Sequence, residues 1–182
     1  MLEKEAFKLN TADFSVNEYV FYKGVGVCRI EAVENKTFDG ERYEDYLKLV
    51  PFGSPGTSSY FIPVGAANAR LRKPMTQDEV NDAIDRSVSD EIRLTPNTKE
   101  RRSAIDTILK GGDCTQILSL IKTIDTHTRL CRDSGRKVLV SDENALRTAE
   151  NMIYPEFSFV LGIQENEVAD YIGQRLASPA NA

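Results

Sequence analysis

Two different hydrophobic patterns divide the chain near Pro74. Between Phe14 and Pro63, apolar and polar residues alternate with a period of two, and β-branched and aromatic residues are frequent. This alternation is typical of strands that bury one face. It predicts strands at 19–22, 27–34, 42–50 and 58–62, with a turn at 23–26, an Asp-Gly hairpin turn at 39–40 and a loop at 51–56. Such short antiparallel strands predict a small, strongly bent barrel, because a small sheet must curl to bury one face.

After Pro74 the apolar positions follow a helical period. Thr76 and Glu79 have the spacing of a capping box, and Val80, Ala83, Ile84 and Val88 are expected to form one apolar stripe behind it. Further helices are expected to begin near Asn97, Asp113, Ser141 and Gln164, while Gly112 and Gly135 interrupt the pattern. The second of them is expected to place Ala104, Ile105, Ile108 and Leu109 on its apolar face.

These patterns predict an α+β fold with a small β-barrel domain at 14–74 and an all-helical bundle at 75–178. Residues 1–13 form an N-terminal extension, and residues 179–182 form a tail.

Composition favours a cytoplasmic protein without a membrane span. The chain has 182 residues, of which 41% are hydrophobic and 28% charged, close to the average for soluble domains. It contains no apolar run long enough to cross a bilayer, and its first residues lack the apolar core of a signal peptide. Its three cysteines have no CxxC spacing, which fits a reducing compartment.

The residues that most enzymes use are scarce. The chain has one histidine, His127, and its spacing to Cys131 supplies only two of the three or four ligands that zinc requires. Gly24-Val25-Gly26 lacks the third glycine of a phosphate-binding loop and precedes a strand instead of a helix. We therefore expect no catalytic residue, no metal and no cofactor.

Charge is distributed unevenly along the chain. The net charge is −5, yet residues 99–137 carry nine basic and five acidic groups and lie between two acidic segments. If the basic side chains share one face, they can contact the phosphates of a duplex. The alternative is an ordinary solvated surface that Glu100, Asp106 and Asp133 neutralise locally. Seven of the nine basic side chains form two groups, one of Lys99, Arg101 and Arg102 and one of Arg129, Arg132, Arg136 and Lys137.

A series of short motifs in a fixed order resembles the CarD/CdnL family of bacterial transcription regulators, whose N-terminal module is shared with transcription-repair coupling factor. The motifs of the first half are Val20-Phe21-Tyr22, Gly24-Val25-Gly26, Ile30-Glu31, Asp39-Gly40, Tyr46-Leu47-Lys48-Leu49, Ile62-Pro63 and Leu71-Arg72. Those of the second half are Arg101-Arg102, Gly112-Asp113, Leu120-Ile121-Lys122-Thr123, Ser141-Asp142-Glu143 and Tyr154-Pro155-Glu156-Phe157.

The resemblance implies a function without catalysis. The N-terminal module would be a Tudor-like β-barrel that docks on the β subunit of RNA polymerase, partly by adding an edge strand to the partner. The helical domain would touch promoter DNA at the upstream edge of the melting region and favour the open complex. The implied polymerase-binding residues are Lys36, Tyr60, Phe61, Ile62 and Pro63, and the implied DNA-binding residues are Thr98, Lys99, Arg101, Arg102, Arg132, Arg136 and Lys137.

One departure from the family bears on the DNA contact. Some relatives insert a Trp into the minor groove, but this chain has no Trp, and Thr98 lies near that position. DNA contact is therefore expected to rest on phosphates and to be weak unless polymerase supplies the local concentration. We expect a monomer. Two hypotheses follow: a polymerase-bound regulator of the open complex, or a module that binds polymerase or another protein without productive DNA contact.

Overall fold

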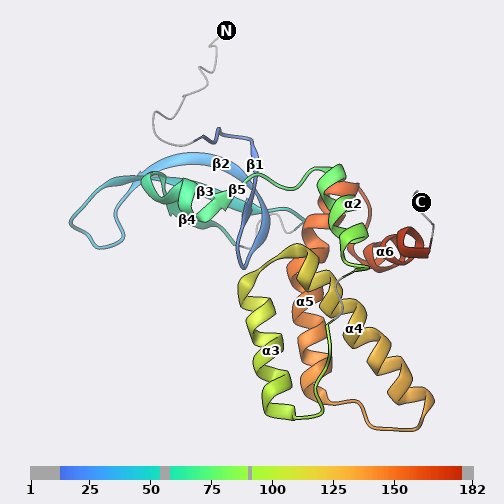
Figure 1. Cartoon of the computed structure of the whole chain (residues 1–182). Helices are drawn as coiled ribbons and strands as arrows, with labels where there is room; N and C mark the ends of the chain where they lie inside the picture. Colours follow the sequence, from blue (N-terminus) through green and yellow to red (C-terminus); the bar gives the residue numbers. More distant parts are fainter. Residues whose placement is uncertain (1–12, 54–57, 90–91, 178–182) are drawn as a thin grey trace. The chain divides into compact units, whose positions relative to one another are not determined.

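The computed structural model describes residues 13–53, 58–89 and 92–177 (Figure 1). The chain divides into two compact units that meet in the sequence between Pro74 and Met75. The first holds an antiparallel sheet and is called the β unit, and the second holds helices and is called the helical unit. This confirms the predicted α+β class, with a β domain followed by a helical domain.

The sheet of the β unit has five antiparallel strands in the order β4-β3-β2-β1-β5. Strands β4 and β5 form its two edges, and a β4–β5 ladder, which would close the predicted barrel, is not among the pairings of the described residues. The strands are β1 (Tyr19–Tyr22), β2 (Gly26–Lys36), β3 (Glu44–Pro51), β4 (Tyr60–Pro63) and β5 (Leu71–Arg72). A short helical passage, η1 (Val64–Ala66) and α1 (Ala67–Arg70), connects β4 to β5 and was not predicted from the sequence.

A bulge in β2 bends the sheet over its core. Ile30 pairs with Leu49 and Ala32 pairs with Lys48, so Glu31 is an extra residue without a cross-strand partner. Bulges of this kind bend a strand and increase its twist. The bent sheet encloses a core of buried side chains that includes Val20, Cys28, Ile30, Leu47, Leu49 and Ile62.

Cys28 is expected to resist thiol reagents until the β unit unfolds. Burial raises the pKa of its thiol to about 11, and the reactive species is the thiolate. Because the unfolded thiol ionises first, at a pKa of about 8.5, the stability of the β unit falls as pH rises from there towards 11. Ellman's reagent at pH 8 should modify Cys28 much more slowly than the half-buried Cys114 in the folded chain, and at a similar rate in guanidinium. Equal rates in the folded chain would contradict this account.

Local capping signals set the helix boundaries of the helical unit. Thr76 and Glu79 form the predicted capping box, and the side chains of Asn97 and Asp113 cap the two following helices. Gly112 ends one of them in the left-handed conformation, with a φ of 72°, which glycine adopts at little cost. The elements are α2 (Gln77–Arg86), α3 (Thr98–Gly111), α4 (Cys114–Asp133), α5 (Val140–Leu161), η2 (Glu165–Glu167) and α6 (Val168–Ala177).

The core of the helical unit gathers apolar side chains from α2, α4, α5 and α6. Phe157 of α5 is fully buried, and Ile84 of α2, Ile117 of α4 and Val168 of α6 belong to the same cluster. Ala104 is exposed and Val88 is 51% exposed, so the predictions that they belong to the apolar faces of the helices at 98–111 and 77–86 are wrong.

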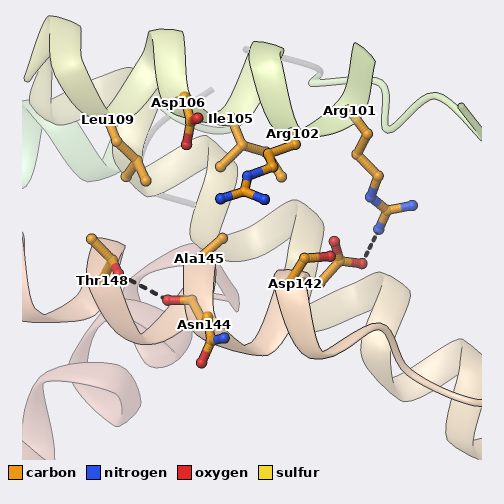
Figure 2. A pocket seen from close by; sticks show the side chains of 10 residues that line it. Arg101, Arg102, Ile105, Asp106, Leu109, Asp142, Asn144, Ala145 and Thr148 are labelled. Carbon is orange, nitrogen blue, oxygen red and sulfur yellow. Dashed lines mark hydrogen bonds and ion pairs between the residues drawn. The ribbon is translucent and has the colours of Figure 1, made fainter. Parts of the chain in front are cut away.

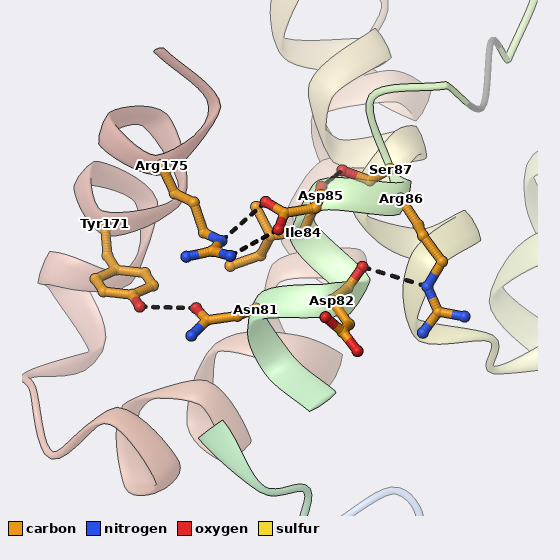
Figure 3. A network of polar contacts seen from close by, with 8 residues as sticks. All are labelled: Asn81, Asp82, Ile84, Asp85, Arg86, Ser87, Tyr171 and Arg175. Carbon is orange, nitrogen blue, oxygen red and sulfur yellow. Dashed lines mark hydrogen bonds and ion pairs between the residues drawn. The ribbon is translucent and has the colours of Figure 1, made fainter. Parts of the chain in front are cut away.

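Two polar contacts join α6 to α2 (Figure 3). The hydroxyl of Tyr171 donates to the side-chain oxygen of Asn81 at 2.8 Å. The guanidinium of Arg175 donates two hydrogen bonds, of 2.9 and 2.6 Å, to the carboxylate of Asp85. This bidentate pair raises the pKa of Arg175 and fixes the orientation of both side chains. The last helix is thus held by directional contacts as well as by apolar burial.

A buried carboxylate fixes the start of the helical unit. Glu156 of α5 is 3% exposed and accepts a hydrogen bond from the backbone N–H of Met75 at 3.0 Å. It follows Pro155, which lies inside α5 and has no N–H to offer the helix ladder. This hydrogen bond to α5 therefore fixes the position of the backbone just before α2 begins.

Candidate functional surfaces

Strand β4 presents one edge of the sheet. On one side it pairs with β3, where Phe61 lies opposite Lys48 and Pro63 opposite Tyr46. Its other side is the edge of the sheet, where backbone N–H and C=O groups can pair with a strand from another chain. Pro63 ends this edge, because it has no N–H to donate.

The predicted polymerase-binding residues of β4 point to both faces of the strand, and Lys36 lies on the neighbouring part of β2. Phe61 lies on the face that also carries Lys36, whose ammonium is 3.9 Å from the centre of the Phe61 ring. Tyr60 lies on the opposite face, with its ring 6.0 Å from that of Tyr22. Ile62 is 1% exposed and its side chain belongs to the core, so the implied polymerase contact of this residue is limited to its backbone.

Ion pairs surround the aromatic face of this edge. Lys48 lies 2.5 Å from Glu31, and Lys36 lies 2.6 Å from Glu34. The hydrogen bond between Lys48 and Glu31 lowers the pKa of Glu31 and raises that of Lys48. Lys36 thus contacts a carboxylate and an aromatic ring together, and most of the charge on this face is balanced.

Aromatic side chains extend the face towards the β2–β3 hairpin. The ring of Phe38 lies 4.9 Å from that of Tyr46 and 5.8 Å from that of Phe61, measured between centroids. Phe38 and Tyr43 are 66% and 71% exposed, although both are large apolar residues. Neither was predicted as a site residue, although aromatic residues on both sides of an Asp-Gly turn were a usable signal.

In the helical unit, the first turns of α3 and α5 are joined by an ion pair. The guanidinium of Arg101 donates to the carboxylate of Asp142, and both side chains are buried (Figure 2). A buried arginine that already has a carboxylate partner is not available to a phosphate. This corrects the prediction that Arg101 binds DNA, and its role in this structure is to tie α3 to α5.

A cleft of about 440 Å³ lies beside this ion pair, between α3 and α5 (Figure 2). Arg102 lines it from α3, and Asn144 and Thr148 line it from α5. Asp142 was expected only to start the helix; instead it is 1% exposed and holds Arg101. The cleft therefore combines exposed polar side chains, the apolar side chains of Ile105, Leu109 and Ala145, and the buried ion pair.

The remaining predicted DNA-binding residues are exposed at one end of the helical unit. Figure 1 shows the beginnings of α3 and α5 and the end of α4 at this end. Arg132 lies 3.7 Å from Glu143, and Arg101 contacts Asp142, so one member of each basic group contacts the first turn of α5. The beginnings of α3 and α5 add two positive dipole ends to this surface, and the end of α4 adds a negative one. We call it the cationic end; its exposed members are Thr98, Lys99, Arg102, Arg132, Arg136 and Lys137.

Apolar side chains accompany these cations. Leu130, Leu139 and Val140 are 58%, 40% and 69% exposed, and this exposure was not predicted from the sequence.

His127 and Cys131 lie in contact, with the sulfur 3.5 Å from Nδ1. No group of three or more metal-ligating side chains occurs in the part of the chain that the structure describes.

Comparison with known families decides the nature of the β unit. A family model of the CarD-like/TRCF RID domain matches residues 14–75. The β unit is a CarD-like/TRCF RID domain. Domains of this family interact with RNA polymerase in transcription, so the CarD-like unit is an RNA polymerase-interacting module.

The match ends at Met75, so the resemblance of the helical unit to the second domain of CarD-like proteins stays a prediction. No curated protein matches the chain. Among the described residues, no helix is both long enough and apolar enough to cross a membrane.

Proposed function

We propose that this protein is a transcription regulator that binds the β subunit of RNA polymerase through the edge of β4 and changes the stability of the promoter open complex through the cationic end. Such a factor needs no catalysis. A protein that binds the open complex more tightly than the closed one shifts the equilibrium by the difference in affinity.

The observation that carries the proposal is an edge strand in a CarD-like/TRCF RID domain. The match covers the whole sheet, and β4 is at its edge, with Phe61 and Lys36 on one face. An edge strand can bind a partner strand through main-chain hydrogen bonds, while neighbouring side chains fix the register. This supports polymerase as the partner and addition of a strand to β4 as the mode of contact.

The cationic end supports the second half of the proposal. Lys99, Arg102, Arg136 and Lys137 are exposed near the starts of two helices, an arrangement that favours phosphate. The whole chain nevertheless has a net charge of −5, so its affinity for free DNA should be low. Binding to polymerase would raise the local concentration of this end at the promoter.

A second candidate is an interaction module that binds polymerase without productive DNA contact. The burial of Arg101 favours it, because one of the expected phosphate contacts is lost to Asp142. The absence of Trp from the chain points in the same direction, since Thr98 cannot wedge between bases.

Charge removal at the cationic end separates the two candidates. The triple variant Arg102→Ala, Arg136→Ala, Lys137→Ala leaves the buried pair intact, and the control variant Lys122→Ala, Arg147→Ala removes exposed cations elsewhere in the helical unit. The proposal predicts that the triple variant binds polymerase normally but loses its effect on the lifetime of the open complex. The slope of the logarithm of this effect against the logarithm of salt concentration should decrease by the amount expected for about three phosphate contacts. An open-complex lifetime equal to that with the unmodified protein would favour the interaction module.

A further inference from the structure

A pocket of about 530 Å³ lies at the tip of the β2–β3 hairpin, beyond the residues that the family resemblance assigns to polymerase. Its floor and walls are formed by three aromatic rings, two carboxylates and one guanidinium. The lining residues are Phe38, Asp39, Arg42, Tyr43, Glu44 and Tyr46.

Two of the aromatic rings of the pocket contact each other, and two are largely exposed. Phe38 packs edge-to-face on Tyr46, with their planes 77° apart. The hydroxyl of Tyr46 is held by Glu44, to which it donates at 2.6 Å. Tyr43 and Phe38 are 71% and 66% exposed, and contiguous exposed aromatic residues are typical of interaction sites.

The charge around these rings is negative. Residues 39–45 contain four carboxylates and one basic side chain, Arg42. The backbone N–H groups of Arg42 and Glu41 and the hydroxyl of Thr37 donate to Asp39 and lower its pKa to about 2. Asp39 therefore stays ionised at any physiological pH, and Arg42 offsets only one of the four negative charges.

The same aromatic face already binds a cation within the chain. The ammonium of Lys36 lies 3.9 Å from the centre of the Phe61 ring, and Phe61 in turn packs against Phe38. Aromatic faces attract ammonium and guanidinium groups through the negative charge above the ring. The pocket continues this face, and its own guanidinium, that of Arg42, does not lie over Phe38 or Tyr43 among the described cation–ring contacts.

We propose that this pocket binds a lysine or arginine side chain of the protein that docks along β4. The aromatic faces of Phe38, Tyr43 and Tyr46 would hold the cationic group, and Asp39 and Glu44 would complement its charge. Identifying that protein as RNA polymerase rests on the proposed function, whereas the preference of the pocket for a cationic side chain does not.

The test uses the full chain and two readouts. In the first, acetyl-Gly-Arg-Gly-amide and acetyl-Gly-norleucine-Gly-amide are titrated while the aromatic NMR signals are followed. In the second, affinity for RNA polymerase is measured for the unmodified chain and for the variants Tyr43→Ala and Glu44→Gln. Phe52→Ala serves as the matched control, because Phe52 is also an exposed aromatic residue of the β unit but does not line the pocket.

The proposal predicts that only the arginine peptide shifts the signals of Phe38, Tyr43 and Tyr46, and that Tyr43→Ala removes these shifts. Tyr43→Ala and Glu44→Gln should weaken polymerase binding by about three- to tenfold, with Phe52→Ala unchanged. Equal shifts with both peptides, or none, would overturn the pocket as a cation site. If the arginine peptide shifts the signals while the unmodified chain fails to bind polymerase, the proposed partner is wrong and the preference for a cation stands.

Discussion

Replacing Arg101 by Ala should destabilise the helical unit by about 3–5 kcal/mol, measured as the free energy of unfolding in urea. Asp142 is 1% exposed, so removal of its arginine would leave a carboxylate buried without a counter-charge. Desolvation of that unpaired charge causes the loss, which exceeds the value of the pair itself. The effect is therefore far larger than expected for an exposed arginine.

Two variants make this prediction specific. Arg102→Ala removes the neighbouring exposed guanidinium and should change stability by less than about 0.5 kcal/mol. The double variant Arg101→Met, Asp142→Leu replaces both charges with apolar side chains and should recover most of the lost stability. An Arg101→Ala variant as stable as Arg102→Ala would show that the pair does not form in solution.

Replacing Phe157 by Ala should cost about 3–5 kcal/mol, and the loss should be confined to the helical unit. Phe157 is fully buried among residues of α2, α4 and α6, so its removal leaves a cavity that the surrounding helices cannot fill. Since the chain forms two compact units, the β unit should keep its fold. NMR signals of β-unit amides such as that of Ile30 should therefore persist in urea at which the helical signals are lost.

The matched control reverses this pattern. Leu47 is fully buried in the core of the β unit, and Leu47→Ala should destabilise that unit by about 2–5 kcal/mol while leaving the helical signals in place. Loss of all signals at one urea concentration in both variants would contradict independent units.

Local chemistry explains why much of the fold was predictable. The capping box of Thr76 and Glu79 and the caps at Asn97 and Asp113 involve residues two or three apart, so the sequence carries them directly. In β2 the predicted alternation holds only in part: Cys28 and Ile30 are buried on one side, but Val27 is buried as well, and residues 31–34 after the bulge are all half-buried.

Contacts between distant residues were not predictable in the same way. Arg101 meets Asp142, and Glu156 meets the backbone of Met75, only because helices far apart in the sequence pack together. A pattern of charges cannot distinguish a guanidinium that faces solvent from one that meets a carboxylate on another helix. The assignment of Arg101 to DNA failed for this reason, whereas its neighbour Arg102 stays exposed.

The residues of β4 likewise show one feature that the sequence predicted and one that depended on contacts with distant residues. Alternation placed Phe61 and Ile62 on opposite faces of the strand, but the polymerase assignment followed the resemblance and included both. Pairing with β3 then placed Ile62 in the core. The aromatic pocket at the hairpin tip depends on how β2 and β3 bring Phe38 and Tyr46 together, which the sequence alone does not specify.

The central claim is that the β unit docks on the β subunit of RNA polymerase. Its most direct test is a binding titration of the full chain against purified bacterial RNA polymerase, with the isolated β-subunit lobe as competitor. The account predicts saturable binding that the lobe displaces, because both would pair with the edge of β4. Absence of binding at micromolar concentrations, or binding that the lobe fails to displace, would contradict docking on the β subunit.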